Sequence, residues 1–456
     1  MSFFERLNAW ARRSVTLKLA IIGIMILFLI IPTVLLEDLI SDRQRLRDNA
    51  QEEISSKWGL DQVVGGPIIS VPYNYLVPAA DNQMATRAGY AHFLPGELNI
   101  DGEVSPEERY RGIFVAVLYN TKLTITGSFD GFNAEALSIP PTALRWEDAF
   151  INVGISDMTG VQEVSGMSVG DTLLELGPGT VTTENFSSGA SAPLRLTGRE
   201  KNLAFEFSLD LNGSSSLYFR PFGKKTTANL RGTWNNPSFD GEFLPRERSV
   251  ADGTFAAQWE VLQLNRNYPQ QGVGKLVPNY NTSVRKFRSY NRIYEQESPE
   301  DVFGVRLLLP VDEYQKTYRS TSYAILFIFI TFLTFFFIEV LNKRRVHPIQ
   351  YLLIAAAIIL FYVLLLSISE HLRFDAAYWL SCVVIVVLIT GYSWFILRNA
   401  KLTGLVAGML LLLYVFFYSI LQLQDYALLF GSLGLLLILA TVMWLTRNID
   451  WYRLNE

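Results

Sequence analysis

The stretch PVDEYQKTYRSTSYAILFIFITFLTFFFIEVLNKRRVHP, from Pro310 to Pro348, decides the fold because it joins two chemically different halves of the chain. A polar lead-in runs into an almost unbroken apolar segment, Tyr323 to Leu341, which ends at a basic cluster (Lys343, Arg344 and Arg345). About 19 apolar residues at about 1.5 Å per residue match the hydrocarbon layer of a bilayer. We therefore predict one helix over residues 311–341, a connector outside the membrane that continues as a membrane span.

A second apolar run, Leu19 to Leu36, lies near the N-terminus and follows four basic residues, Arg6, Arg12, Arg13 and Lys18. A charged start before an apolar run also begins a secretory signal peptide. This run is longer than a typical signal core, and EDLISD beyond it offers no small-x-small cleavage site. We predict a retained anchor over residues 1–36, with Pro32 near its outer end.

Residues 37–58 keep a helical rhythm of apolar positions three and four apart, ending at Trp58 before a plausible stop at Gly59. The pattern predicts a helical connector that leaves the membrane. Its apolar stripe fits a helix packed on its own domain, and it also fits a coiled coil with a partner.

From residue 59 to 310 the apolar period changes from 3.6 to 2, which predicts strands. The clearest hairpin signal is LAFEFSLDL-NG-SSSLYFRP, where Asn212-Gly213 suits a type I′ turn. Ten or more short strands with turn signals predict an all-β, sandwich-like domain, for which two packed sheets are one arrangement. Further predicted strands are GPIISVPY (66–73), RGIFVAVLY (111–119), TKLTITGSF (121–129), AFINVGI (149–155), TTANLRGTW (226–234), FAAQWEVLQL (255–264) and VFGVRLLLP (302–310).

Residues 342–456 hold four more apolar runs, so six transmembrane helices are expected, one before the β domain and five after it. The fold class is a membrane protein of α+β type. The four runs are Tyr351 to Ser367, Ala376 to Leu397, Leu402 to Leu421 and Tyr426 to Leu445.

The basic residues between the spans predict the orientation, because Lys and Arg are retained on the cytoplasmic side. With the N-terminus inside, eleven basic residues fall on the cytoplasmic side, whereas the two short outer loops hold only Arg373. This predicts cytoplasmic termini and a β domain on the outer side of the membrane. The eleven are Arg6, Arg12, Arg13, Lys18, Lys343, Arg344, Arg345, Arg398, Lys401, Arg447 and Arg453.

Charge and motifs exclude several function classes. Residues 37–319 carry 36 acidic against 27 basic residues, so no basic footprint for nucleic acid exists. Three histidines and the single Cys382 form no zinc motif, and no complete P-loop or GxSxG nucleophile motif occurs. No cofactor is implied, and no catalytic motif supports an enzyme.

One ionisable residue, Glu339, lies within a predicted span, a turn from its cytoplasmic end. Such residues often mark function in transporters. Lys343 follows at i+4, so we interpret Glu339 as half of a helix-end ion pair.

Two groups of residues are candidates for interaction sites. The first has residue types that recur in binding hot spots, although aromatic side chains of a β domain are more often core; it comprises Trp234, Phe239, Phe243, Trp259, Arg266 and Tyr268. The second lies in the outer loop SEHLRFDAA and is either a catalytic or ligand cluster or an ordinary charged turn; it comprises Glu370, His371, Arg373 and Asp375.

Several segments together resemble the CreD family of bacterial inner-membrane proteins along the full length. The resemblance implies a Gram-negative inner membrane, a periplasmic domain, expression under a two-component system, and a role in envelope integrity or envelope stress response. It supplies no catalytic residue. The segments are GPIISVPY, RGIFVAVLY, WNNPSFDGEFLP (234–245), LNRNYPQ (264–270), FGVRLLLPVDEYQKTYRSTSYAILFI (303–328) and TRNIDWY (446–452).

The leading hypothesis is a non-enzymatic inner-membrane protein that supports envelope integrity. Its β domain, rigidly coupled to the spans by the connectors 37–58 and 311–341, would bind a periplasmic or envelope partner. The alternatives are a protein that binds or transfers a lipid or amphiphile, and a membrane enzyme acting on an envelope substrate. The sequence leaves the partner, the activity and the oligomeric state open.

Overall fold

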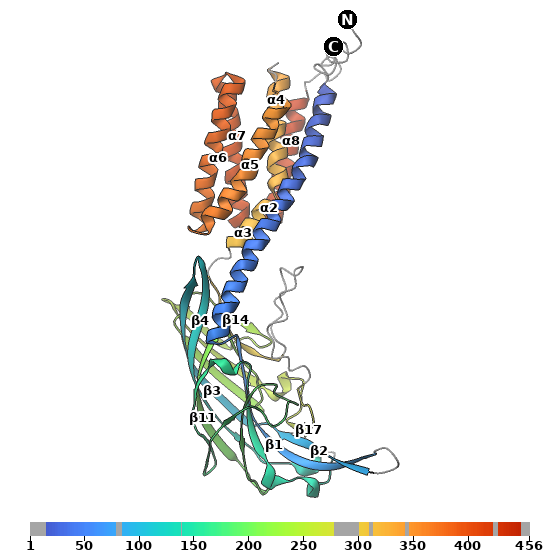
Figure 1. Cartoon of the computed structure of the whole chain (residues 1–456), viewed down its shortest axis with the longest axis vertical. Coiled ribbons are helices and arrows are strands. Elements are labelled where there is room, and N and C mark those ends of the chain that lie inside the picture. The colour runs from blue at the N-terminus through green and yellow to red at the C-terminus, as the bar shows by residue number, and fades with distance from the viewer. Residues whose placement is uncertain are drawn as a thin grey trace. The chain divides into compact units, whose positions relative to one another are not determined.

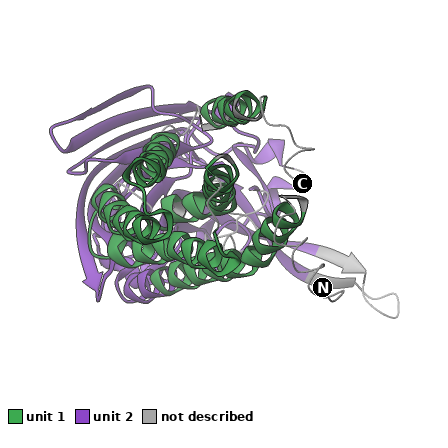
Figure 2. Ribbon diagram, turned by 90° about the horizontal axis from the view of Figure 1, so that it is seen from above, with its two compact units in different colours: residues 1–47, 311–456 green, residues 48–310 purple. Residues whose placement is uncertain are grey.

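The computed structural model describes residues 15–78, 84–137, 139–277, 301–309, 313–342, 346–422 and 427–447. The chain divides into two compact units, coloured separately in Figure 2. Residues 1–47 and 311–456 form what we call the helical unit, and residues 48–310 form the β domain.

The helical unit contains the apolar helices that the sequence predicts (Figure 1). Among the described residues, five helices are long and apolar enough to cross a membrane, and the apolar part of a further helix, Leu429–Trp444, is shorter. A protein with five or six apolar helices and a large β domain between the first and the rest confirms the α+β membrane class. The helices are α2 (Val15–Trp58), α3 (Glu313–Thr321), α4 (Ala324–Leu341), α5 (Pro348–Ser369), α6 (Phe374–Leu397), α7 (Ala400–Gln422) and α8 (Ala427–Thr446).

The expected single helix over 311–341 is wrong in one respect, because a turn at Ser322 and Tyr323 separates α3 from α4. The Oγ1 of Thr321 donates to the Tyr318 carbonyl at 2.8 Å, and the Oγ of Ser322 donates to the same carbonyl at 3.4 Å. Hydroxyl side chains that bind nearby carbonyls compete with the helical backbone bonds, and here they accompany the break. Residues 311 and 312 lie outside the described part.

The β domain is built from two nine-stranded sheets. Sheet A has the order β14-β18-β12-β1-β5-β10-β9, with β2 beside β1 and β17 beside β2; sheet B has the order β15-β16-β13-β3-β4-β11-β7-β8, with β6 beside β11. The strands of sheet A are β1 (Gln62–Pro78), β2 (Met84–Phe93), β5 (Phe150–Ile155), β9 (Gly177–Pro178), β10 (Gly189–Pro193), β12 (Ser216–Phe219), β14 (Pro237–Gly241), β17 (Gln271–Val273) and β18 (Phe303–Leu307). Those of sheet B are β3 (Glu97–Arg111), β4 (Phe114–Phe129), β6 (Val161–Val164), β7 (Met167–Val169), β8 (Thr172–Leu174), β11 (Leu203–Ser214), β13 (Lys225–Gly232), β15 (Glu247–Ala251) and β16 (Thr254–Leu262).

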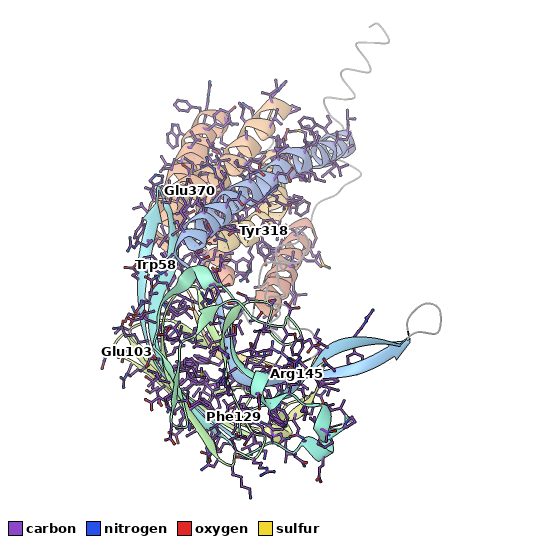
Figure 3. All side chains as sticks on the ribbon, turned by 60° about the horizontal axis from the view of Figure 1, so that its bottom comes forward. Trp58, Glu103, Phe129, Arg145, Tyr318 and Glu370 are labelled. Atoms are coloured by element: carbon purple, nitrogen blue, oxygen red, sulfur yellow. The ribbon has the colours of Figure 1, made fainter. Side chains whose placement is uncertain are left out.

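One apolar core draws side chains from both sheets, as expected of a sandwich. Along β16 buried and exposed residues alternate strictly, and Trp259 on its inner face has no exposed surface. Figure 3 shows how densely side chains fill the β domain around Phe129. The period-2 pattern therefore gives a large core, which leaves the outer face of sheet B to polar residues.

The predicted Asn212-Gly213 hairpin is wrong. β11 continues through both residues, where Asn212 pairs with Asn120 and Gly213 with Tyr119. A Cβ on Gly213 would overlap the ring hydroxyl of Tyr119, so this glycine permits a close approach and does not form a turn. The chain instead leaves sheet B at Ser215, which has φ of 57°, and enters sheet A as β12.

The last turns of α2, residues 48–58, pack on the β domain. The Nε2 of Gln51 donates to the Val115 carbonyl at 2.8 Å, and the indole Nε1 of Trp58 donates to the Tyr119 carbonyl at 3.2 Å. The predicted helix over 37–58 is confirmed as part of α2, and these contacts favour packing on its own domain over a coiled coil.

Candidate functional site

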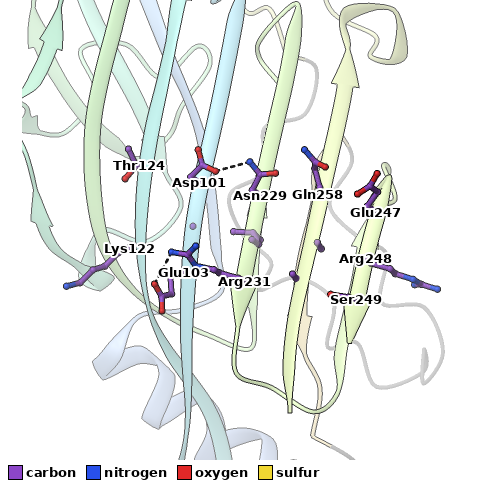
Figure 4. A pocket seen from close by; sticks show the side chains of 14 residues that line it. Asp101, Glu103, Lys122, Thr124, Asn229, Arg231, Glu247, Arg248, Ser249 and Gln258 are labelled. Carbon is purple, nitrogen blue, oxygen red and sulfur yellow. Dashed lines mark hydrogen bonds and ion pairs between the residues drawn. The ribbon is translucent and has the colours of Figure 1, made fainter. Parts of the chain in front are cut away.

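A polar groove of about 560 Å³ crosses the outer face of sheet B (Figure 4). Its floor lies on the neighbouring strands β15, β16, β13, β3 and β4, and an antiparallel sheet with one buried face leaves the other face to polar side chains. The lining residues with larger polar side chains are Asp101, Glu103, Lys122, Thr124, Asn229, Arg231, Glu247, Arg248 and Gln258.

Five side chains form a straight row across the groove, because each residue lies opposite the next in the sheet register. Glu247 pairs with Gln258, Gln258 with Asn229, Asn229 with Asp101, and Asp101 with Thr124. Neighbouring strands lie about 4.8 Å apart, so donors and acceptors recur at that interval. The row can hydrogen-bond an extended polar molecule that lies across the strands.

Acidic and basic side chains balance in the groove, three of each. The Asn229 Nδ2 donates to Asp101 Oδ1 at 2.8 Å, and Arg231 lies 3.4 Å from Glu103. Both contacts are exposed, and the second is an ion pair, which contributes only about 0–1 kcal/mol when exposed, so a ligand can displace Arg231 from Glu103 at little cost. The lining contains no histidine or cysteine. The arrangement suits binding of a polar molecule of low net charge.

A second groove, of about 630 Å³, lies beside the end of β2. Its rim contains Lys224, whose Nζ donates to Asp130 at 2.8 Å, and Gln271, whose Nε2 donates to the Asn133 carbonyl at 2.7 Å. Phe93 and Phe132 form part of its wall, with ring centroids 5.1 Å apart. Neither groove was identified from the sequence, although alternating polar residues in the strands were visible there.

The predicted aromatic candidates lie in or against the core. Trp259 makes an edge-to-face contact with Phe239, with ring centroids 5.8 Å apart, and its Nε1 donates to the Phe243 carbonyl at 3.1 Å. Trp234 is half-buried and its Nε1 donates to the Leu308 carbonyl at 3.0 Å. These contacts account for the four residues as packing and anchoring groups.

Arg266 and Tyr268 are also buried, and they hold backbone segments together. Arg266 donates to the carbonyls of Tyr268 at 3.0 Å and Phe222 at 3.1 Å, while the Tyr268 hydroxyl donates to the Pro221 carbonyl at 3.0 Å. Burial lowers the pKa of Arg266 and raises the pKa of Tyr268, because both charged forms lose solvation. An internal arginine that binds carbonyls is a structural anchor.

The four residues of the outer-loop group do not converge. Glu370 accepts from the Tyr314 hydroxyl at 3.1 Å and lies 3.8 Å from Arg43 of α2. Asp375 instead accepts from the Tyr418 hydroxyl at 3.0 Å. Arg373 is exposed at the start of α6, and His371 Nδ1 lies 3.2 Å from the carbonyl of Ser367, one turn earlier. These contacts match a charged turn whose members bind different helices.

A buried polar chain in sheet A escaped the sequence analysis. Ser70 Oγ lies 2.8 Å from His92 Nδ1, and His92 Nε2 lies 2.8 Å from Glu184 Oε2. Asn152 Nδ2 donates to the same serine oxygen at 3.0 Å. Serine, histidine and a carboxylate form hydrolase triads, but Ser70 is fully buried and cannot meet a substrate in this conformation. These hydrogen bonds connect the loop that contains Glu184 to β1 and β2.

Glu339 has a partner that the sequence analysis did not foresee. Its Oε1 accepts from Lys18 Nζ of α2 at 2.6 Å, and its Oε2 lies 3.4 Å from the Tyr351 hydroxyl of α5. Lys343, the partner expected from spacing, lies outside the described residues. The ion pair ties α2 to α4 within the helical unit.

Comparison with known proteins identifies the family. The family model described as "Inner membrane protein CreD" matches residues 14–452. The Inner membrane protein CreD of Escherichia coli (strain K12) is 33% identical over 432 residues, which cover 94% of this chain and 91% of that protein. The expected resemblance is thereby confirmed over nearly the whole length. This chain belongs to the CreD family of inner membrane proteins.

Proposed function

We propose that this protein supports the integrity of the cell envelope, or its response to stress, by binding an envelope partner through the β domain without catalysis. Family membership and the polar groove support this proposal. The groove on sheet B carries it, since its exposed row of amide, carboxylate and hydroxyl groups suits a polar polymer or an extended peptide segment.

The orientation expected from the basic residues belongs to the same proposal, with both termini cytoplasmic and the β domain periplasmic. Single-cysteine variants test it. In a Cys382→Ser background, a cysteine replacing Ser249 in the groove should react with a membrane-impermeant maleimide added to cells with a permeabilised outer membrane. A cysteine replacing Asn399, between α6 and α7, should react only after lysis. The reverse labelling pattern would show that the protein has the opposite membrane topology.

The helix α2 supports coupling between binding and the membrane. It is continuous from Val15 to Trp58, so the same helix contributes residues to both units. Its residues 48–58 contact the β domain, and Lys18 contacts α4. We infer that α2 carries a change of state in the β domain toward the membrane.

The functional test compares groove variants with a matched control on the same face of sheet B. Cells without the chromosomal gene would carry the full chain, either unchanged or as the double variant Asp101→Ala/Asn229→Ala. The double variant should fail to restore the barrier to a hydrophobic dye, whereas Glu206→Ala, exposed on β11 outside the groove, should restore it. Equal membrane levels of all variants are required. Full restoration by the double variant would refute a role for the groove.

A further inference from the structure

Polar side chains occupy one face of α6 and one face of α7 at the end of the helical unit where α6 begins. On α7, Tyr414, Tyr418 and Gln422 follow one another at i+4, and on α6, Asp375 and Tyr378 lie three apart, so each set lies along one side of its helix. The two faces meet. The Tyr418 hydroxyl and the Gln422 Nε2 both donate to Asp375 Oδ1, at 3.0 and 2.8 Å.

One turn further into the unit, the hydroxyl of Tyr378 donates to the carbonyl of Tyr414 at 2.8 Å. Beyond this bond lie three hydroxyls that have no hydrogen-bond partner in the described part of the chain: those of Tyr362 on α5, Ser381 on α6 and Tyr414 on α7. Each of these side chains is at most 1% exposed.

Polar residues between membrane helices commonly join the helices by hydrogen bonds. That explanation holds for Asp375, Tyr378 and Tyr418, whose bonds are accounted for. It does not hold for the three deeper hydroxyls, because an adhesive role requires a partner.

An unsatisfied buried hydroxyl destabilises the folded state, and native structures contain few of them. The rings of Tyr362 and Tyr414 lie 5.0 and 4.7 Å from the ring of Phe361, and Ser381 follows Tyr378 at i+3 on α6. This cluster of unpaired donors on neighbouring helices points to a bound molecule, which we call the guest.

The surroundings restrict the chemistry of that guest. Rings of Phe361 and Phe327 lie 4.7 and 4.9 Å from the ring of Tyr414, which makes the walls aromatic and apolar. Further along the helices, Ile385 and Leu410 are buried and apolar. The next hydroxyls without a hydrogen-bond partner in the described residues are those of Thr390 on α6 and Thr403 on α7.

The charge at the outer end of these polar faces also restricts the kind of molecule that can bind. The carboxylate of Asp375 lies at that end, and no basic side chain is hydrogen-bonded to the described groups of the cluster. A phosphate or carboxylate headgroup would be repelled by this carboxylate. Basic side chains do lie near this end of α6, since Arg373 precedes its first residue and Lys316 Nζ lies 5.4 Å from the ring of Phe374. An uncharged oxygen acceptor suits the three hydroxyl donors without repulsion from the carboxylate of Asp375.

We propose that α5, α6 and α7 bind the uncharged, oxygen-bearing polar group of an amphiphile, with the hydroxyls of Tyr362, Ser381 and Tyr414 donating to its carbonyl or hydroxyl oxygens. The apolar part of the amphiphile contacts the phenylalanine rings. This site does not depend on the groove of the β domain, so either proposal can fail without the other.

The test uses the full chain in nanodiscs of phosphatidylcholine. Three probes are titrated: a short-chain ubiquinone, dioctanoylglycerol and dioctanoylphosphatidic acid. Binding is followed by tryptophan fluorescence, for which Trp379, with its ring 5.0 Å from that of Tyr418, is the reporter. At least one neutral probe should bind saturably, and the anionic probe should bind at least about tenfold more weakly.

Tyr362→Phe and Tyr414→Phe should each weaken neutral-probe binding by about tenfold, because each removes one hydrogen bond. Tyr392→Phe on α6, outside the cluster, is the matched control and should bind normally. Without probe, both cluster variants should be at least as heat-stable as the unchanged protein, since each loses an unsatisfied polar group. Preference for the ubiquinone or for the glyceride would identify the source of the amphiphile.

Absence of saturable binding by both neutral probes would overturn the proposal and leave water as the occupant. Unchanged binding by the double variant Tyr362→Phe/Tyr414→Phe would overturn it as well. Equal or tighter binding of the phosphatidic acid would refute the assignment of an uncharged guest.

Discussion

Replacing Lys18 by methionine removes the cation that neutralises Glu339 while it keeps most of the apolar stem of the side chain. Glu339 is only 5% exposed, and Lys18 Nζ lies 2.6 Å from its carboxylate. The contact with the Tyr351 hydroxyl at 3.4 Å is too long to replace the ion pair. We therefore expect the helical unit of the Lys18→Met protein to be destabilised.

The size of the destabilisation follows from the burial of the ion pair between Lys18 and Glu339. Breaking a buried ion pair by removing one partner costs about 3–5 kcal/mol, because the remaining charge stays buried. Lys18 is 30% exposed, so water partly solvates the pair, and the lower figure, about 3 kcal/mol, applies. For a unit of this size that corresponds to a decrease of about 6–12 °C in the midpoint of thermal unfolding.

The assay is thermal unfolding of the full chain in mild detergent, followed by far-ultraviolet circular dichroism of the helical transition. The double variant Lys18→Met/Glu339→Met should recover most of the loss, because no charge is then buried. Lys343→Met tests the partner expected from spacing and should change the midpoint little. A large decrease for Lys343→Met together with a normal midpoint for Lys18→Met would refute the reasoning.

Three further predictions concern the β domain. Gly154→Ala would place a Cβ inside the ring of Phe186 and should destabilise the domain by about 3 kcal/mol, seen as a lower thermal midpoint. Burial raises the pKa of Tyr268, so the folded state keeps a proton that the unfolded state loses. The contribution of Tyr268 to stability should therefore be complete below about pH 10 and fall above it by about 1.4 kcal/mol per pH unit, in addition to the losses from Tyr119 and Tyr218, whose pKa values burial also raises; urea unfolding measures the sum. Arg266→Met leaves several carbonyls without their donor and should cost about 3 kcal/mol, measured as a lower urea midpoint.

Matched variants separate these effects from general damage. Gly177→Ala meets only ordinary contact, with Ser191 O at 3.6 Å, and should leave the thermal midpoint unchanged. Arg246→Met removes an exposed arginine and should cost little. Tyr268→Phe should make the alkaline loss of stability less steep by about 1.4 kcal/mol per pH unit, while Tyr119 and Tyr218 still contribute. An unchanged alkaline slope in that variant, or a normal midpoint for Gly154→Ala, would contradict the corresponding prediction.

Local periodicity was enough to predict the spans, the helical connector after the first anchor and the strand-rich domain. Non-local pairing was not visible in the sequence. β1 pairs in parallel with β12, which joins Gln62 to Leu217, and no local pattern encodes a partner so distant. The Asn212-Gly213 prediction failed for a related reason, since Gly213 is required by the ring of Tyr119 on a neighbouring strand.

The candidate site shows the same contrast between local patterns, which can be recognised in the sequence, and non-local pairing, which cannot. Alternation predicts that Asp101 and Asn229 face outward, but only the order of strands in sheet B places them side by side in one groove. The pairing of Lys18 with Glu339 spans 321 positions, whereas Lys343 at i+4 was the one partner that spacing could offer. The polar faces of α6 and α7 could be recognised in the sequence from polar residues three and four positions apart. The contact between the two faces could not.

The position of β18 has a consequence for how the chain is made. This strand is the last of the β domain in sequence, yet it lies between β12 and β14 in sheet A and hydrogen-bonds to both. Until residues 303–307 have emerged from the ribosome, β14 has no place in the sheet. At a synthesis rate of about 5–20 residues per second, β12 waits several seconds for its neighbour. The sheet is therefore completed only after its last strand has left the ribosome, so that translation itself times the closure of the domain.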